Sequence, residues 1–136
     1  MTSIPPLRLF ASLLLLVAFS GCSIAMATRQ PTAKNLAVLD AGTPRDRVIA
    51  ELGWPQRTEV MSDNHRIDHF TFTQGYSKST KNGRAMLHGA ADTVTLGLWE
   101  IIGTPAEMVF DGTELEADVT YEVGRDVVKS SVVRKK

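Results

Sequence analysis

Residues 43–53 read TPRDRVIAELG and contain the signals for the start, the buried face and the end of one helix. Thr43 can cap the first turn, and Pro44 stands at the first helical position, where proline is favoured. An apolar stripe follows at helical spacing, formed by Val48, Ile49 and Leu52. Gly53 can adopt the left-handed conformation that ends a helix. We therefore expect a helix over residues 43–53.

Trp54 follows this helix directly, and Pro55 prevents the helix from continuing. Residues just beyond a glycine C-cap commonly pack back on the last turns, so Trp54 is expected to fold onto Ile49. The alternative is that Trp54 stays accessible and anchors a protein partner, because tryptophan is over-represented in binding hot spots.

The sequence on either side of the helix predicts a small sheet and one more helical turn. Leu36 and Leu39 indicate one or two turns ending near Asp40. Residues 57–61 and 66–73 are β-prone and separated by a turn, as are the alternating residues 116–123 and the segment 127–133. We expect an α+β fold with two short N-terminal helices packed on an antiparallel sheet of about four strands.

An insert over about residues 77–110 separates the two predicted hairpins. Residues 75–83 look like a polar loop, and residues 84–102 have helical periodicity with a polar line at steps of four, formed by Arg84, His88 and Asp92, with Glu100 later. We expect the opposite, apolar stripe to pack on the domain. Gly97 and the preceding β-branched residues indicate a break in this helix.

A second interpretation of this insert involves a membrane. Leu96, Leu98, Trp99 and Ile101 could dip into a lipid interface if the helix lies on a bilayer. Lysine and arginine are scarce on the polar side of helix 84–102, and this scarcity argues against the second interpretation.

The first residues have the composition of an export signal. Arg8 precedes a short apolar run, residues 9–19, and small residues follow. The run is too short to span a bilayer, which takes about 20 apolar residues. Residues 1–21 are therefore predicted to be a signal peptide.

Residues 19–22, Phe-Ser-Gly-Cys, resemble the lipobox of bacterial lipoproteins, although Phe19 stands where leucine is usual. The resemblance implies that Cys22 is acylated and becomes the mature N-terminus, and that Ser23 favours sorting to the outer membrane. Cys22 is the only cysteine, so no internal disulfide can form. Residues 22–33 are expected to be the lipidated N-terminus and a tether, followed by a single domain over residues 34–136.

The charge balance excludes some partners. The chain has 15 lysines and arginines and 15 aspartates and glutamates, so no basic field attracts nucleic acid. Membrane attachment is expected through the N-terminal acyl chains.

No catalytic, metal or cofactor site is predicted. Two of the three histidines, His65 and His69, stand roughly 13 Å apart if they share a strand, too far to chelate one metal ion. The third, His88, is expected on a solvated helix face beside Asp92 or Arg84. The sequence contains no phosphate loop and no Glu-x-x-His pair. We expect a protein that is not an enzyme and binds no metal or cofactor.

Residues 39–55, LDAGTPRDRVIAELGWP, resemble the signature of the SmpA/OmlA, or BamE-like, lipoproteins. Those proteins share a Gly-x-Thr/Ser start, a valine in mid-helix and a Leu-Gly-x-Pro exit into a strand. The resemblance covers residues 34–73 and, more loosely, residues 115–133. It implies two helices on a small antiparallel sheet, an outer-membrane location, and kinship to an accessory subunit of the machinery that inserts β-barrels. The insert over residues 77–110 departs from the compact members.

These observations favour a non-enzymatic scaffold or accessory lipoprotein of the outer membrane, facing the periplasm and contacting other envelope proteins, with β-barrel assembly as one such role. One alternative is a small-ligand or inhibitory binding module that uses an open sheet face containing Tyr121 or Phe70. Another is a membrane-surface stress lipoprotein acting through helix 84–102. The candidate interaction residues are Trp54, Tyr121 and Trp99.

Overall fold

The computed structural model describes residues 21–122 and 124–136, and these residues form two compact units. The helical unit contains, of the described residues, 21–30 together with Tyr76–Asp111. The α+β unit contains Pro31–Gly75 and Gly112–Lys136. The residues of the expected single domain, 34–136, are divided between the two units, and the predicted insert, residues 77–110, corresponds to Tyr76–Asp111 of the helical unit. Residues 1–20 of the predicted signal peptide lie outside the described residues.

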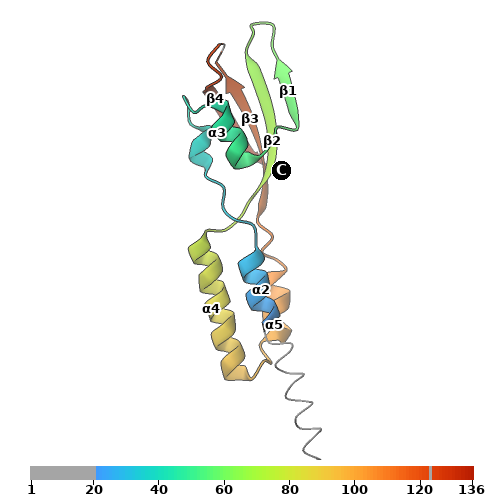
Figure 1. The fold of residues 1–136 in the computed structure, drawn as a ribbon. Coiled ribbons are helices and arrows are strands. Elements are labelled where there is room, and N and C mark those ends of the chain that lie inside the picture. Colours follow the sequence, from blue (N-terminus) through green and yellow to red (C-terminus); the bar gives the residue numbers. More distant parts are fainter. Residues whose placement is uncertain (1–20, 123) are drawn as a thin grey trace, which may run out of the picture. The chain divides into compact units, whose positions relative to one another are not determined.

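The α+β unit is built on a four-stranded antiparallel sheet with the order β1-β2-β3-β4 (Figure 1). The α+β class predicted from the sequence is confirmed. Strands β2 and β3 pair from Arg66↔Tyr121 to Gln74↔Thr113, although the helical unit separates them in the chain. The elements are η1 (Leu36–Leu39), α3 (Arg45–Leu52), β1 (Arg57–Val60), β2 (Arg66–Gln74), β3 (Thr113–Tyr121) and β4 (Val128–Lys135).

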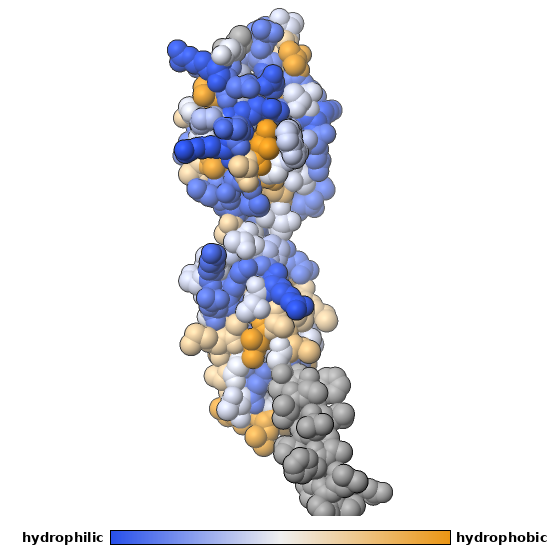
Figure 2. Space-filling view, in the orientation of Figure 1, coloured by the Kyte–Doolittle hydropathy of each residue, from blue (hydrophilic) through white to orange (hydrophobic). Residues whose placement is uncertain are grey.

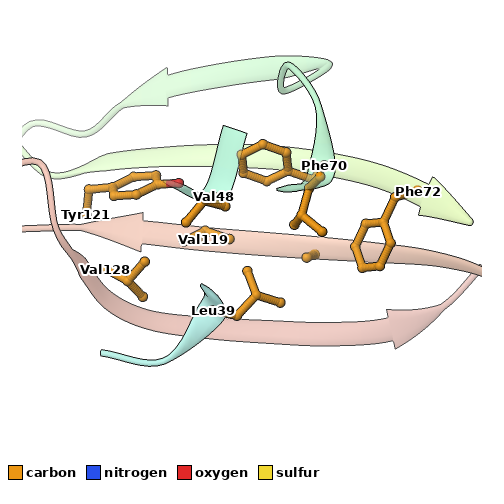
Figure 3. Close-up of a cluster of buried hydrophobic side chains, with 9 residues drawn as sticks. Leu39, Val48, Phe70, Phe72, Val119, Tyr121 and Val128 are labelled. Carbon is orange, nitrogen blue, oxygen red and sulfur yellow. The ribbon is translucent and has the colours of Figure 1, made fainter. Parts of the chain in front are cut away.

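Alternation along β2 and β3 places apolar side chains on one face of the sheet, where η1 and α3 cover them (Figure 3). Leu39 and Val48 contribute to this cover, and Phe70 and Tyr121 are only 2% and 1% exposed. The exposed apolar patch at Tyr121 or Phe70 that the ligand-binding alternative requires is therefore not present in the described residues. Helical side chains fill the place that a ligand would need.

The start of α3 differs from its prediction in a way that the neighbouring strand explains. The Thr43 side chain makes no cap, and the helix begins at Arg45 after Pro44. The backbone of Thr43 instead accepts a hydrogen bond from the amide of Val128, at 2.8 Å, and the Gly42 amide donates to the Val128 carbonyl, at 2.7 Å. Pairing with β4 holds this segment extended where capping was expected.

The helical unit consists of α2 (Cys22–Arg29), α4 (Lys78–Thr95) and α5 (Glu100–Glu107), which lie side by side (Figure 1). The expected tether over residues 22–33 is wrong for its first part, because α2 packs against both other helices and buries Ser23 and Ala27 completely. Small side chains at these two positions let the helices approach closely.

Helix α4 begins earlier and ends earlier than the helix expected over residues 84–102. The polar loop expected over residues 75–83 is wrong, because Ser77 caps α4 by accepting a hydrogen bond from the Thr80 amide at 3.1 Å. Helix 84–102 is not continuous. Leu96 and Gly97 both have positive φ angles, 56° and 84°, which confirms the predicted break. Among the described residues, no helix is both long enough and apolar enough to cross a membrane.

Candidate functional site

The polar line of α4 faces the interior of the helical unit. His88 and Asp92 are 5% and 7% exposed, and Lys81 and Glu107 are also buried. The apolar side chains of α4, such as Met86 and Val94, face outward. Two expectations are therefore wrong: the apolar stripe does not pack inward, and His88 does not lie on a solvated face. The polar line points inward because charged partners from α5 meet it there.

Glu107 is the centre of this interior. Its carboxylate accepts hydrogen bonds from Nε and Nη2 of Arg84, at 3.1 and 2.7 Å, and lies 2.9 Å from Nε2 of His88. Burial raises the pKa of Glu107, but the hydrogen bonds from Arg84 and His88 outweigh burial and hold the pKa below its ordinary value. A charged carboxylate is thus stable at this buried position.

His88 links this carboxylate to Trp99. The indole Nε1 of Trp99 donates to Nδ1 of His88 at 2.8 Å, and an indole N–H can only donate. The His88 proton therefore resides on Nε2, where it is donated to Glu107. Gly103 makes room for this contact, because a Cβ there would lie 2.7 Å from the Trp99 nitrogen and 3.0 Å from Nδ1 of His88.

The aromatic rings of Tyr76 and Phe110 hold the guanidinium of Arg84 from outside. Its carbon lies 4.8 Å from the Tyr76 ring centre and 4.1 Å from the Phe110 ring centre. Nearby, the Lys81 ammonium donates to the backbone carbonyl of Gln30 at 2.8 Å. The C-terminal end of α2 therefore lies beside the basic first half of α4.

The opposite end of α2 begins at Cys22, whose side chain is exposed. Glu100 fixes this start: its carboxylate accepts hydrogen bonds from the amides of Gly21, at 2.8 Å, and Ser23, at 3.1 Å. The hydroxyls of Ser23 and Thr104 also donate to it. Burial raises the Glu100 pKa, but these donors outweigh burial and lower it overall. A carboxylate at a helix N-terminus also interacts favourably with the helix dipole.

Asp92 lies next to this arrangement. Both of its carboxylate oxygens are buried without a hydrogen-bond partner. Burial first, and then the charge of Glu100, raise the pKa of Asp92 above its ordinary value. Protonation of Asp92 is therefore easier in the folded unit than in water.

The outer surface around this end of the helical unit is apolar. We call five residues the apolar tip; each is between 62% and 84% exposed, and they are Val94, Leu96, Leu98, Ile101 and Ile102. Figure 2 shows apolar colours toward the lower end of the helical unit and hydrophilic colours at its other end. Four titratable residues lie between Arg84 and Asp111: three of them are buried, and the fourth, Glu100, binds the start of α2.

The α+β unit presents different candidates. Trp54 is 80% exposed, so the expectation that it folds onto Ile49 is wrong. Gly53, with φ 97°, ends α3 without returning the chain to that contact. Tyr121 is buried in the core, and Trp99 is half-buried in the helical unit, so of the three predicted interaction residues Trp54 is the most accessible.

A charged hollow on the outer face of the sheet was not predicted. Nδ1 of His69 lies 2.6 Å from Asp118, whose other oxygen accepts a hydrogen bond from Arg134 at 2.7 Å. Burial raises the Asp118 pKa, but hydrogen bonds from Arg134 and His69 lower it overall. These side chains line a hollow of about 360 Å³. Within residues 21–122 and 124–136, no group of three or more metal-ligating side chains is placed to hold a metal ion.

The sequence analysis overlooked Glu107 and Gly103. Neither residue has a local signal in the sequence, because a carboxylate in a segment without lysine or arginine can equally face water, and the role of Gly103 depends on the folded unit. Comparisons of the chain with family models, curated proteins and solved structures give no match.

Proposed function

We propose that this protein is a non-enzymatic lipoprotein of the bacterial outer membrane, anchored through acyl chains on Cys22, with the α+β unit in the periplasm. The observation that carries the proposal is the position of Cys22: an exposed thiol at the first residue of α2, at the end of the helical unit that has the apolar tip. The lipobox-like residues 19–22 support the same reading.

The hydrogen bonds of Glu100 matter for this anchoring. Because the Ser23 amide and hydroxyl both bind Glu100, α2 remains fixed to α5 once the residues before Cys22 are removed. The acyl chains then attach to a packed helix without a long linker. The helical unit is in this way held directly at the bilayer surface.

The α+β unit is proposed to have the BamE-like arrangement, with two short helices on a small antiparallel sheet and a helical insert. Support comes from the single hydrophobic core that η1 and α3 form with the sheet. Its role is that of a scaffold for envelope proteins, including those that assemble β-barrels. The exposed Trp54 favours such a role, because a large aromatic side chain left in water is a ready anchor for a protein partner.

Mass spectrometry of the N-terminal peptide from purified envelopes tests the anchoring. The expected peptide begins at Cys22 and carries acyl chains, and the Cys22→Ala chain should keep its leader and leave the outer-membrane fraction. A thiol at residue 22 in a chain that retains its leader would contradict the proposal.

Crosslinking in intact cells followed by affinity purification tests the scaffold role. Envelope proteins should be recovered with the wild-type chain and lost with Trp54→Ala. Val60→Ala, at another exposed position of the same unit, is the matched control and should retain them. Recovery of the bait alone from wild-type cells would contradict a scaffold.

A further inference from the structure

We propose that the apolar tip inserts into the acyl-chain region of the membrane and forms a second anchor beside the lipidated Cys22. The proposal rests on the proposed function for the location of the protein. The insertion itself is inferred from the exposed side chains and the internal contacts of the helical unit.

The first argument is the absence of exposed charge. The four titratable side chains between Arg84 and Asp111 point inward or bind α2, so the outside of this segment has no charged group to remove from water. Burying the five exposed side chains of the tip in hydrocarbon is favourable, since each apolar side chain gains by leaving water. Lipid is therefore an environment that this surface can enter without a desolvation penalty from charge.

The second argument is that the unit cannot hide these side chains by rotating its helices. Glu107 is bound to Arg84 and His88, and Glu100 is bound to the amide and hydroxyl of Ser23, which remain after processing. Turning α4 or α5 would break these contacts and leave charges unpaired in the interior. The polar interior thus fixes the apolar residues on the outside.

The third argument concerns depth. Exposed basic residues lie at the other end of the helices: Arg29 ends α2 and Lys78 begins α4. The eight-residue helix α2 is about 12 Å long, so Arg29 would reach the phosphates of the headgroups when the Cys22 end is among the acyl chains. Lys78 lies farther from the tip, at the start of the 18-residue helix α4. The objection that helix 84–102 has few basic residues is answered by residues outside it.

The fourth argument distinguishes lipid from a second copy of the chain. The tip is tied to the acylation site, because Glu100, next to Ile101, binds the amide and hydroxyl of Ser23, the residue after Cys22. Acyl chains on Cys22 therefore bring the tip to the bilayer surface. Stable membrane attachment commonly needs a second signal beside lipidation, and the tip supplies one.

Fluorescence of Trp99 in the acylated full chain tests the proposal, with Trp54→Phe removing the other tryptophan. The protein is reconstituted into vesicles of phosphatidylcholine and phosphatidylglycerol, with and without brominated acyl chains. Brominated lipid should quench the fluorescence of Trp99. Acrylamide, which stays in the water, should quench that fluorescence less in vesicles than in buffer that contains neither vesicles nor detergent. The double variant Leu98→Gln, Ile101→Gln should lose most of the lipid quenching.

The matched control is Val60→Gln, Val132→Gln, which changes two exposed residues of the α+β unit and should leave the quenching unchanged. Absence of lipid quenching in a chain that mass spectrometry shows to be acylated would overturn the tip insertion and leave the anchoring at Cys22 intact. Shielding of Trp99 from both quenchers, together with a crosslinked dimer, would overturn it in favour of self-association.

Discussion

The two units of this protein arrange polar and apolar side chains in opposite ways. In the α+β unit, phenylalanine and valine side chains form the interior, and charged residues such as Asp118 and Arg134 lie on the outer face of the sheet. In the helical unit, Glu107, His88 and Asp92 form the interior, and leucine and isoleucine side chains lie outside. Each unit is therefore suited to a different environment.

The difference teaches where stability comes from in each unit. Removal of apolar area from water stabilises the α+β unit. The helical unit gains less from that effect, because many of its large aliphatic side chains stay exposed. Its stability depends on charge-assisted hydrogen bonds in a protected interior, which are stronger than neutral ones. Three substitutions test this contrast.

Phe70→Ala should have the largest effect. Phe70 is almost completely buried in the sheet core, and removing its ring should lower the free energy of unfolding of the α+β unit by about 3–5 kcal/mol. Denaturant unfolding followed by hydrogen exchange of β2 and β3 measures this. Exchange in α4 should change far less. Equal loss of protection in both units would mean that they unfold together.

Arg84→Met should have the next largest effect, and in the other unit. The substitution keeps an apolar stem between Tyr76 and Phe110 but removes both hydrogen bonds to Glu107. Loss of hydrogen bonds to a buried charge should cost about 1.5–3 kcal/mol. Hydrogen exchange of α4 and α5 measures the loss, with Arg125→Met, an exposed arginine, as the control. Unchanged protection of α4 and α5 would show that the interior ion pair does not hold the unit.

The α+β unit could be predicted well from the sequence, because hydrophobic patterns locate the buried face of a domain whose interior is apolar. Alternation at residues 116–123 and the paired Phe70 and Phe72 locate the buried face when the core is apolar. The same reasoning failed for the helical unit. Periodicity at Arg84, His88 and Asp92 reveals two faces of a helix, but not which face is inside.

Other features of the candidate site left no local signal. The contact of Glu107 with Arg84 joins residues on different helices, and a single sequence does not reveal such pairing. The need for Gly103 follows from the position of the Trp99 ring, which only the folded unit defines. The prediction for Cys22 has a different basis, because a processing motif is local in sequence; its acylation stays a prediction.

Asp92→Asn should have the smallest effect, visible as a change in pH dependence. The raised pKa of Asp92 means that the folded unit favours the protonated form. Protonation of Asp92 stabilises the folded unit fully below the pKa of Asp92 in the unfolded chain, about 4. This stabilisation is lost as the pH rises through the higher pKa of Asp92 in the folded unit. Asparagine cannot ionise, so the variant should be more stable than wild type above that window and should lack this loss.

Thermal unfolding from about pH 2.5 to about pH 8, with hydrogen exchange resolving the helical unit, covers both sides of the ordinary aspartate pKa of about 4. Below the ordinary aspartate pKa, wild type and Asp92→Asn should behave alike, because Asp92 is then uncharged in both the folded and the unfolded chain. Glu107 and Glu100 have lowered pKa values, so both proteins lose the stabilising effect of these carboxylates in acid to the same extent. Asp92 does not belong to the α+β unit, so the hydrogen-exchange protection of that unit should follow the same pH profile in both proteins. A variant that is less stable than wild type at neutral pH would mean that the Asp92 charge is used in the folded unit, and that its oxygens have a cationic partner there.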